Sequence, residues 1–188
     1  SPPCLHFEQI KLIASNGFDF FVEKPALLSV KQFDVIKDIC NRKKTLFIES
    51  LMYLESDLVK NIIKSSKSKD VIKTISTNFI IPEIPKNTYR NETTFADSLF
   101  ADMICYPLSI LIELDFIIDP DYLKYEIIKK NDKKLFNFKY KQNGTLIYFS
   151  IGEGDSYKND FSLDLKDNLK LNCFPFYYGR AGYKTILT

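Results

Sequence analysis

A lysine that could carry a proton follows a predicted strand in this sequence. Lys24 follows the apolar run 18–22, which predicts a short buried strand, and Pro25 comes directly after it. Ligands bind at the carboxyl ends of strands in open α/β sheets, so this spacing puts Lys24 at a position of that kind. A lysine whose pKa is lowered by burial or by a nearby positive charge can relay a proton to or from a bound ligand. Taken alone, Lys24 would equally fit an ordinary surface lysine.

A second pair of residues has the spacing of one helix face. Asp102 and Tyr106 are four apart in the stretch 95–114, whose apolar pattern predicts a helix. Their side chains can therefore point into one cleft. Pairs with this spacing also occur by chance. The alternative to a functional role for Tyr106 is an aromatic side chain that only packs against its neighbours.

The cysteines do not indicate a metal site or a disulfide framework. They are widely spaced and contain no CxxC pair, and the sequence has a single histidine, His6, that could serve as a further metal ligand. The four are Cys4, Cys40, Cys105 and Cys173. A structural zinc site needs four thiolate or imidazole ligands, usually in closely spaced pairs. We therefore expect no metal, and reduced, partly buried thiols in a cytoplasmic protein.

Composition and charge exclude several classes of protein. Apolar residues make up 45% of the 188 residues and charged residues 27%, as in ordinary globular domains. The 26 basic and 24 acidic residues give a net charge of +2, which provides no electrostatic case for binding nucleic acid or an anionic membrane. No apolar run is long enough to span a bilayer, and the first residues lack the pattern of a secretory signal.

The first fifty residues alternate between helical and strand patterns. Apolar residues at helical spacing cover 7–14, and the strand 18–22 follows. Ser29 and Gln32 have the spacing of a capping box that opens a second helix, and 45–49 reads as a second strand. This order is typical of a parallel α/β sheet. Because two parallel strands need neighbours, we expect the chain to begin in the middle of a larger α/β domain.

The remaining residues predict a sheet covered by helices on one face. Helical patterns cover 55–64 and 95–114, the second containing Pro107. Strand patterns cover 71–81, 122–129, 135–141, 145–151, 162–165 and 169–173. Asn143-Gly144 is a strong hairpin signal, and Asp167-Asn168 marks a second hairpin. The sheet is therefore expected to be mostly antiparallel.

Two stretches of the chain resemble a known enzyme family. Residues 1–25, SPPCLHFEQIKLIASNGFDFFVEKP, are similar in order and spacing to part of the Gfo/Idh/MocA family of NAD(P)-dependent oxidoreductases, which act on sugars, inositols and related polyols. In that family a strand ends in a proline-containing turn, a histidine-containing helix follows, and the next strand finishes in Glu-Lys-Pro. Residues 100–108, FADMICYPL, resemble the family's Asp-x-x-x-His/Tyr helix.

The resemblance implies a fold and an activity. The fold class would be α/β (α+β), with the C-terminal part of a Rossmann-type nucleotide-binding domain over 1–50. A substrate-binding and oligomerisation domain over 51–188 would hold a large, mostly antiparallel open sheet covered by helices. The activity would be hydride transfer between NAD or NADP and a small sugar, sugar derivative or polyol.

The resemblance also implies roles for particular residues. Lys24 would relay the proton, Tyr106 would hydrogen-bond the reacting hydroxyl, and Asp102 would orient the hydroxyl and the substrate. Residues expected to line the cofactor are Ser1, Pro2, Pro3, His6, Glu23, Lys24 and Pro25. For His6 the alternative is a satisfied, partly buried histidine.

The chain departs from the family pattern in two ways. The glycine fingerprint G-x-G-x-x-G is absent, and the family's plan would put it before Ser1, so we expect an N-terminally incomplete chain that is inactive by itself. The family has glycines before Asp102 and this chain has other residues there, so the family's substrate cannot be assigned to this chain. The alternative function is a non-catalytic binding or oligomerisation module. Both functions predict a homo-oligomer formed through the open sheet.

Overall fold

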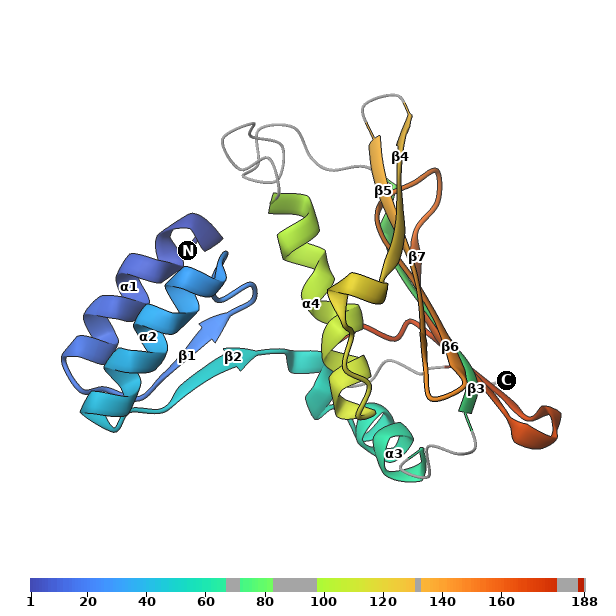
Figure 1. Cartoon of the computed structure of the whole chain (residues 1–188), viewed down its shortest axis with the longest axis horizontal. Helices are drawn as coiled ribbons and strands as arrows, with labels where there is room; N and C mark the ends of the chain where they lie inside the picture. The colour runs from blue at the N-terminus through green and yellow to red at the C-terminus, as the bar shows by residue number, and fades with distance from the viewer. Residues whose placement is uncertain (67–71, 83–97, 131–132, 179–185, 188) are drawn as a thin grey trace. The chain divides into compact units, whose positions relative to one another are not determined.

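The structure is a computed structural model of the whole chain, and it describes residues 1–66, 72–82, 98–130, 133–178 and 186–187 (Figure 1). The chain divides into two units. Unit 1 contains Ser1–Leu51 and Asn87–Cys105, and unit 2 contains Met52–Lys86 and Tyr106–Thr188. The roles assigned above to residues 1–50 and 51–188 stay predictions.

Unit 1 holds a two-stranded parallel sheet with two helices against it. The elements are α1 (Pro3–Ser15), β1 (Phe20–Glu23), α2 (Val30–Lys43) and β2 (Phe47–Ser50). In the sheet, Phe20 pairs with Phe47 and Glu23 with Ser50. One core joins the helices and the sheet, formed by Ile10, Ala14, Phe20, Ile36, Ile39 and Cys40.

The ends of α2 follow from local sequence. The Ser29 side chain accepts a hydrogen bond from the main-chain N–H of Gln32, and the Gln32 side chain accepts one from the N–H of Leu28. The bond from Gln32 satisfies a donor that the first turn of a helix leaves without a partner, as the capping-box pattern predicts, and the bond from Leu28 holds the residue just before the Ser29 cap. At the other end, Lys44 adopts a left-handed conformation that stops the helix.

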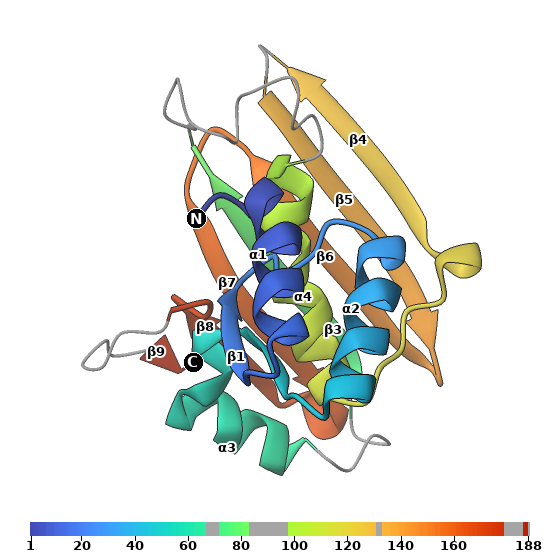
Figure 2. The ribbon, with the colours of Figure 1, turned by 90° about the vertical axis from the view of Figure 1, so that its left-hand side faces the viewer.

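Unit 2 is built on a seven-stranded sheet with the strand order β4-β5-β6-β3-β7-β8-β9 (Figures 1 and 2). The strands are β3 (Ile72–Ile81), β4 (Lys124–Lys130), β5 (Lys133–Gln142), β6 (Thr145–Glu153), β7 (Lys158–Leu165), β8 (Lys170–Phe174) and β9 (Ile186–Leu187). All neighbouring strands are antiparallel except β3 and β6, which are parallel. The helices are α3 (Asp57–Ser65) and the part of α4 (Ser98–Glu113) from Tyr106 onward, with short 3-10 turns at Met52–Glu55, Pro120–Tyr122 and Lys166–Asn168.

The two faces of this sheet differ in chemistry. Side chains alternate between faces along a strand, so the register assigns each residue to a face. One face is apolar and buried, with Ile75, Phe138, Ile147, Phe149, Ile151, Phe161 and Leu163. The opposite face is mostly polar, with Thr74, Ser76, Asn78, Tyr148, Ser150, Asp160 and Ser162. The part of α4 from Tyr106 onward packs on the apolar face, where the Tyr106 ring meets Phe79 edge-on at 4.8 Å between centroids.

The structure confirms the α/β fold class and most of the expected elements. The Asn143-Gly144 turn joins β5 to β6 with positive φ at both residues, 51° and 83°. One local prediction is wrong: the run 18–22 is not a buried strand throughout, because Phe18 and Phe21 are 64% and 78% exposed. Only the Phe20 and Val22 side of β1 contacts the helical core. The expected starts of elements at residues 71 and 95 lie outside the described residues.

Within the described part of the chain, no helix combines the length and the apolar character required to span a membrane.

Candidate active site

Lys24 lies at the carboxyl edge of the parallel pair β1 and β2. It follows Glu23, the last residue of β1, and Glu23 pairs with Ser50 at the end of β2. The Lys24 side chain is 14% exposed, so it is not the ordinary surface lysine that its position alone would fit. The peptide bond between Lys24 and Pro25 is cis.

The ammonium of Lys24 is held by Asp102 of α4. Lys24 Nζ donates one hydrogen bond to Asp102 Oδ1 at 2.7 Å and another to the main-chain oxygen of Asp102, also at 2.7 Å. The Asp102 side chain is only 7% exposed. A charge removed from water to this extent needs an opposite charge and hydrogen bonds, and here each residue meets that need for the other. Both residues belong to unit 1, although 78 positions separate them.

Two further contacts hold the turn that follows Lys24. The buried imidazole of His6 lies with Nδ1 2.9 Å from the main-chain oxygen of Pro25 and Nε2 3.0 Å from that of Ser1. On the other side, the main-chain N–H of Ala26 donates to Glu49 Oε1 at 2.7 Å. The turn is therefore tied to α1 and to β2. Sequence reasoning missed Glu49, which no local pattern marks.

The His6 contacts predict a measurable stability. His6→Phe keeps an aromatic ring but removes both nitrogens, so it leaves the Pro25 oxygen without its partner in a buried place. We expect the free energy of unfolding in urea to fall by about 1–3 kcal/mol. The control is Glu8→Gln on the exposed side of α1, which should change little. Equal stability of the His6 variant and the parent chain would contradict this role.

The other residues predicted to line the cofactor lie near the start of α1 or at the end of β1. Pro2 is the N-cap of α1 and Pro3 its first residue, where a proline costs no hydrogen bond. The Ser1 hydroxyl donates to Gln9 Oε1 at 2.7 Å. Glu23 is exposed. Their predicted contact with a cofactor stays a prediction.

Tyr106 follows Asp102 by one helical turn in α4 and belongs to unit 2. Its ring is partly buried in an aromatic cluster, with centroid distances of 4.8 Å to Phe79, 5.2 Å to Tyr177 and 5.8 Å to Tyr53. The Tyr53 hydroxyl donates to the main-chain oxygen of Tyr106 at 3.0 Å. Sequence reasoning did not find Tyr53, Phe79 or Tyr177, because they come from distant segments that only folding brings together.

Cys105 lies one helical turn from Asp102 of the ion pair, and its thiol is a poor nucleophile. Burial raises the pKa of its thiol to about 12, although the positive charge of Lys24 lowers it. Its Sγ lies 3.6 Å from the main-chain oxygen of Asp102. Burial also raises the pKa of Cys173, to about 11. The thiolate, which is the reactive form, is therefore scarce at both positions.

These pKa shifts predict the order in which the thiols react. At about pH 8, we expect iodoacetamide to label Cys105 and Cys173 at least about 100-fold more slowly than the exposed Cys4. Because the shifts are upward, labelling of Cys105 should accelerate as the pH rises toward 12. Peptide mass spectrometry over time provides the rates, and equal labelling of Cys4 and Cys105 in the folded chain would contradict the burial argument.

Among the residues with described positions, no three histidine, cysteine, aspartate or glutamate side chains gather into a group that could hold a metal ion.

Comparison with known proteins places the fold. No known protein-family profile matches the sequence, and no curated protein matches it. Solved structures do match. A 3-ketoreductase from Actinomadura kijaniata, in complex with NADP and TDP-benzene, superposes with a TM-score of 0.79 at 16% identity, over 99% of this chain and 58% of that one. The chain has the fold of that oxidoreductase.

Two further structures agree. A dehydrogenase from Chromobacterium violaceum has a TM-score of 0.74 at 16% identity and covers 92% of this chain. UDP-N-acetylglucosamine 3-dehydrogenase from Acidithiobacillus ferrooxidans has a TM-score of 0.67 at 12% identity and covers all of it, 100%. The chain spans between 51% and 61% of the length of these three structures.

Proposed function

We propose that this chain is part of an NAD(P)-dependent oxidoreductase of the Gfo/Idh/MocA type that acts on a sugar or sugar derivative. The observation that carries the proposal is the ion pair of Lys24 with Asp102 at the carboxyl edge of a parallel strand pair. A largely buried ammonium at such an edge is suited to proton transfer next to a bound ligand.

The comparisons support this proposal in two ways. The Actinomadura kijaniata ketoreductase was crystallised with NADP and TDP-benzene. Variants of that enzyme with one lysine or one tyrosine replaced were crystallised as well. That lysine and tyrosine are separated in its sequence by nearly the same number of residues as Lys24 and Tyr106. This spacing supports Lys24 and Tyr106 as the corresponding pair.

The residues present fit the reacting end of the cofactor. The turn after β1 presents Lys24 and Pro25 at the edge where ligands bind, and His6 and Glu49 hold that turn. A bound nicotinamide cofactor would supply the hydride. No G-x-G-x-x-G loop for the pyrophosphate occurs in the 188 residues. Ser1, Pro2, Pro3, His6, Glu23, Lys24 and Pro25 therefore remain our proposal for the cofactor side.

Lys24 would move the proton. In the ion pair it is an ammonium, the form that gives a proton, so we propose reduction of a keto group. The proton passes from Lys24 Nζ to the carbonyl oxygen while the carbonyl carbon gains the hydride, which leaves an alcohol and a neutral amine. Asp102 fixes the position of Nζ. Tyr106, one helical turn further along α4, would hydrogen-bond the same substrate oxygen.

Cofactor titration tests the proposed function. NADH and NADPH fluorescence is followed as this chain is added, in parallel with a form extended upstream if the gene encodes one. The sequence has no tryptophan, so the nicotinamide signal is easy to read. Binding by the extended form supports the oxidoreductase. Binding by neither form supports the alternative, a non-catalytic binding or oligomerisation module with this fold.

Association of two copies through the open sheet is part of the same proposal. The face of the sheet opposite α4 is mostly polar, so we expect such an interface to rest on hydrogen bonds more than on apolar contact. Sedimentation equilibrium of the chain, with Ser76→Lys on that face as the interrupting variant, provides the test.

A further inference from the structure

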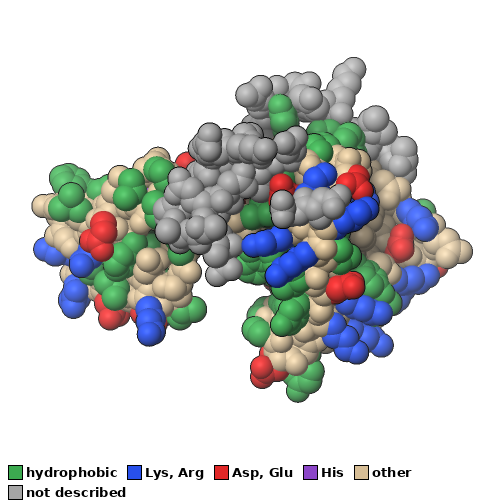
Figure 3. Space-filling model, turned by 90° about the horizontal axis from the view of Figure 1, so that it is seen from above, with side chains coloured by type: hydrophobic (Ala, Val, Ile, Leu, Met, Phe, Trp, Pro, Cys, Tyr) green, Lys and Arg blue, Asp and Glu red, His purple; other side chains and the backbone are tan. Residues whose placement is uncertain are grey.

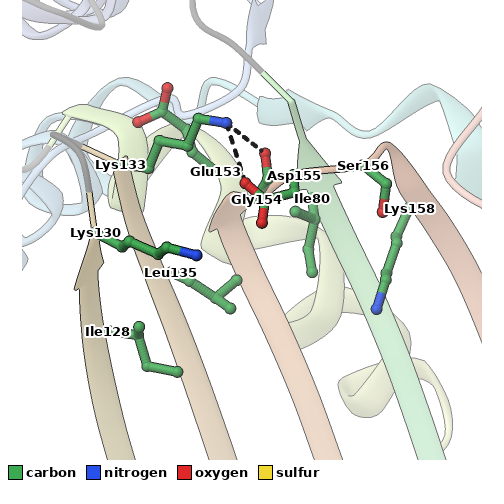
Figure 4. Close-up of a pocket in the computed structure, with 10 residues that line it drawn as sticks. All are labelled: Ile80, Ile128, Lys130, Lys133, Leu135, Glu153, Gly154, Asp155, Ser156 and Lys158. Atoms are coloured by element: carbon green, nitrogen blue, oxygen red, sulfur yellow. Dashed lines mark hydrogen bonds and ion pairs between the residues drawn. The ribbon is translucent and has the colours of Figure 1, made fainter.

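A cavity of about 310 Å³ opens on the polar face of the sheet, at the end formed by β4 and β5 (Figure 4). All of its lining residues belong to unit 2, so neither Lys24 nor Asp102 contributes to it. Its lining comes from five strands and the segment between β6 and β7. This volume is at the lower end of the range for small-molecule sites in proteins.

The strand register shows which residues form the floor of the cavity. Five residues form one row across the sheet, paired neighbour to neighbour, and therefore share a face: Ile128, Leu135, Gly152, Ile80 and Lys158. The central position is Gly152, with a φ of 128°, and a Cβ there would collide with the main-chain oxygen of Lys134. This position therefore carries no side chain, because the backbone of β5 occupies the space beside it. Leu135 and Ile80 form an apolar floor on either side of it.

Ammonium groups surround this floor. Lys130 and Lys158 lie on opposite sides of Leu135 and Ile80 (Figure 4). Lys133 also lines the cavity, but it donates to the main-chain oxygen of Gly154 at 3.1 Å and lies 3.5 Å from Asp155. The second carboxylate in the lining is that of Glu153. Three lysines against two carboxylates leave the lining net positive.

One opposed lysine pair of the β4–β5 hairpin faces the cavity. Lys130 stands directly opposite Lys133 in the register and shares the face of Ile128 and Leu135, whereas Lys129 and Lys134 lie on the other face. Like charges at opposed positions destabilise a strand pair, and an anion bound beside Lys130 relieves that repulsion. Figure 3 shows basic side chains, with acidic side chains among them, over part of the described surface.

We propose that this cavity binds a small organic anion, with its phosphate or carboxylate between Lys130 and Lys158 and its apolar body on Leu135 and Ile80. The ammonium groups supply charge complementarity, and the apolar side chains of Leu135 and Ile80 supply contact for the body. The inference does not depend on the proposed redox function, because it uses no residue of that site.

The test uses phenyl phosphate as the probe and the methyl NMR signals of Ile80 and Ile128 in this chain as the reporters. We expect both signals to shift with a saturable dependence on phenyl phosphate. Phenol has the same body without charge, and inorganic phosphate has the charge without the body. Both should bind at least about ten-fold more weakly, since each lacks one of the two contributions.

Charge variants locate the site. Lys130→Gln and Lys158→Gln should each weaken binding about three-fold, and the double variant about ten-fold. The matched control is Lys129→Gln, which removes the neighbouring charge of β4 from the other face of the sheet. Equal weakening by Lys129→Gln and Lys130→Gln would overturn the proposal, because it would mean attraction by the general positive field. Binding of inorganic phosphate as tight as that of phenyl phosphate, or unmoved isoleucine signals, would overturn it as well.

Discussion

Lys24→Met should lower the turnover of the cofactor-binding form of this protein by about 100- to 10,000-fold, the range for loss of a proton-transferring side chain. Methionine matches the length of lysine but has no proton to give, so the alkoxide that forms during keto reduction would lack its partner. NADPH binding should stay close to that of the parent, because the variant removes the proton donor and leaves the source of the hydride, the cofactor, unchanged. The measurement is steady-state NADPH consumption with a keto-sugar substrate.

A matched lysine separates chemistry from charge. Lys31 is exposed on α2 in the same unit, and Lys31→Met removes the same charge without touching the ion pair. It should leave turnover unchanged. Near-normal turnover of Lys24→Met would remove Lys24 from the mechanism.

The second large effect concerns stability. Lys24→Met leaves the Asp102 carboxylate, 7% exposed, without its cation, and we expect the free energy of unfolding to fall by about 3 kcal/mol. Asp102→Asn has a smaller effect, because Lys24 keeps the main-chain oxygen of residue 102 as an acceptor. The double variant should be more stable than the sum of the two losses by about 1–3 kcal/mol, since it leaves no unpaired buried charge.

Urea unfolding of the four forms provides this cycle, and a surface pair provides its control. Lys60 and Glu55 form an ion pair at 2.6 Å with both side chains well exposed. Their hydrogen bond raises the pKa of Lys60, but water screens the pair, so Lys60→Met should leave stability nearly unchanged. Strict additivity of the Lys24 and Asp102 changes would show that the two charges do not depend on each other.

The sequence determined the features that depend on neighbouring residues. Ser29 and Gln32 cap α2, and Asn143-Gly144 joins β5 to β6, because each is satisfied by atoms a few positions away. The position of Lys24 at a strand end followed from the apolar run before it and the proline after it. The α/β class also followed, since the periods of helices and strands are local.

Only the tertiary structure decided which distant residues meet. The pairing of Lys24 with Asp102 across 78 positions, and the packing of Tyr106 against Tyr53, Phe79 and Tyr177, have no local pattern. The same holds for the parallel register of β3 and β6 and for the cavity between Lys130 and Lys158. These features depend on strand order and register, which are determined by the side-chain contacts of the whole sheet taken together. A short stretch of sequence contains only one side of each of those contacts.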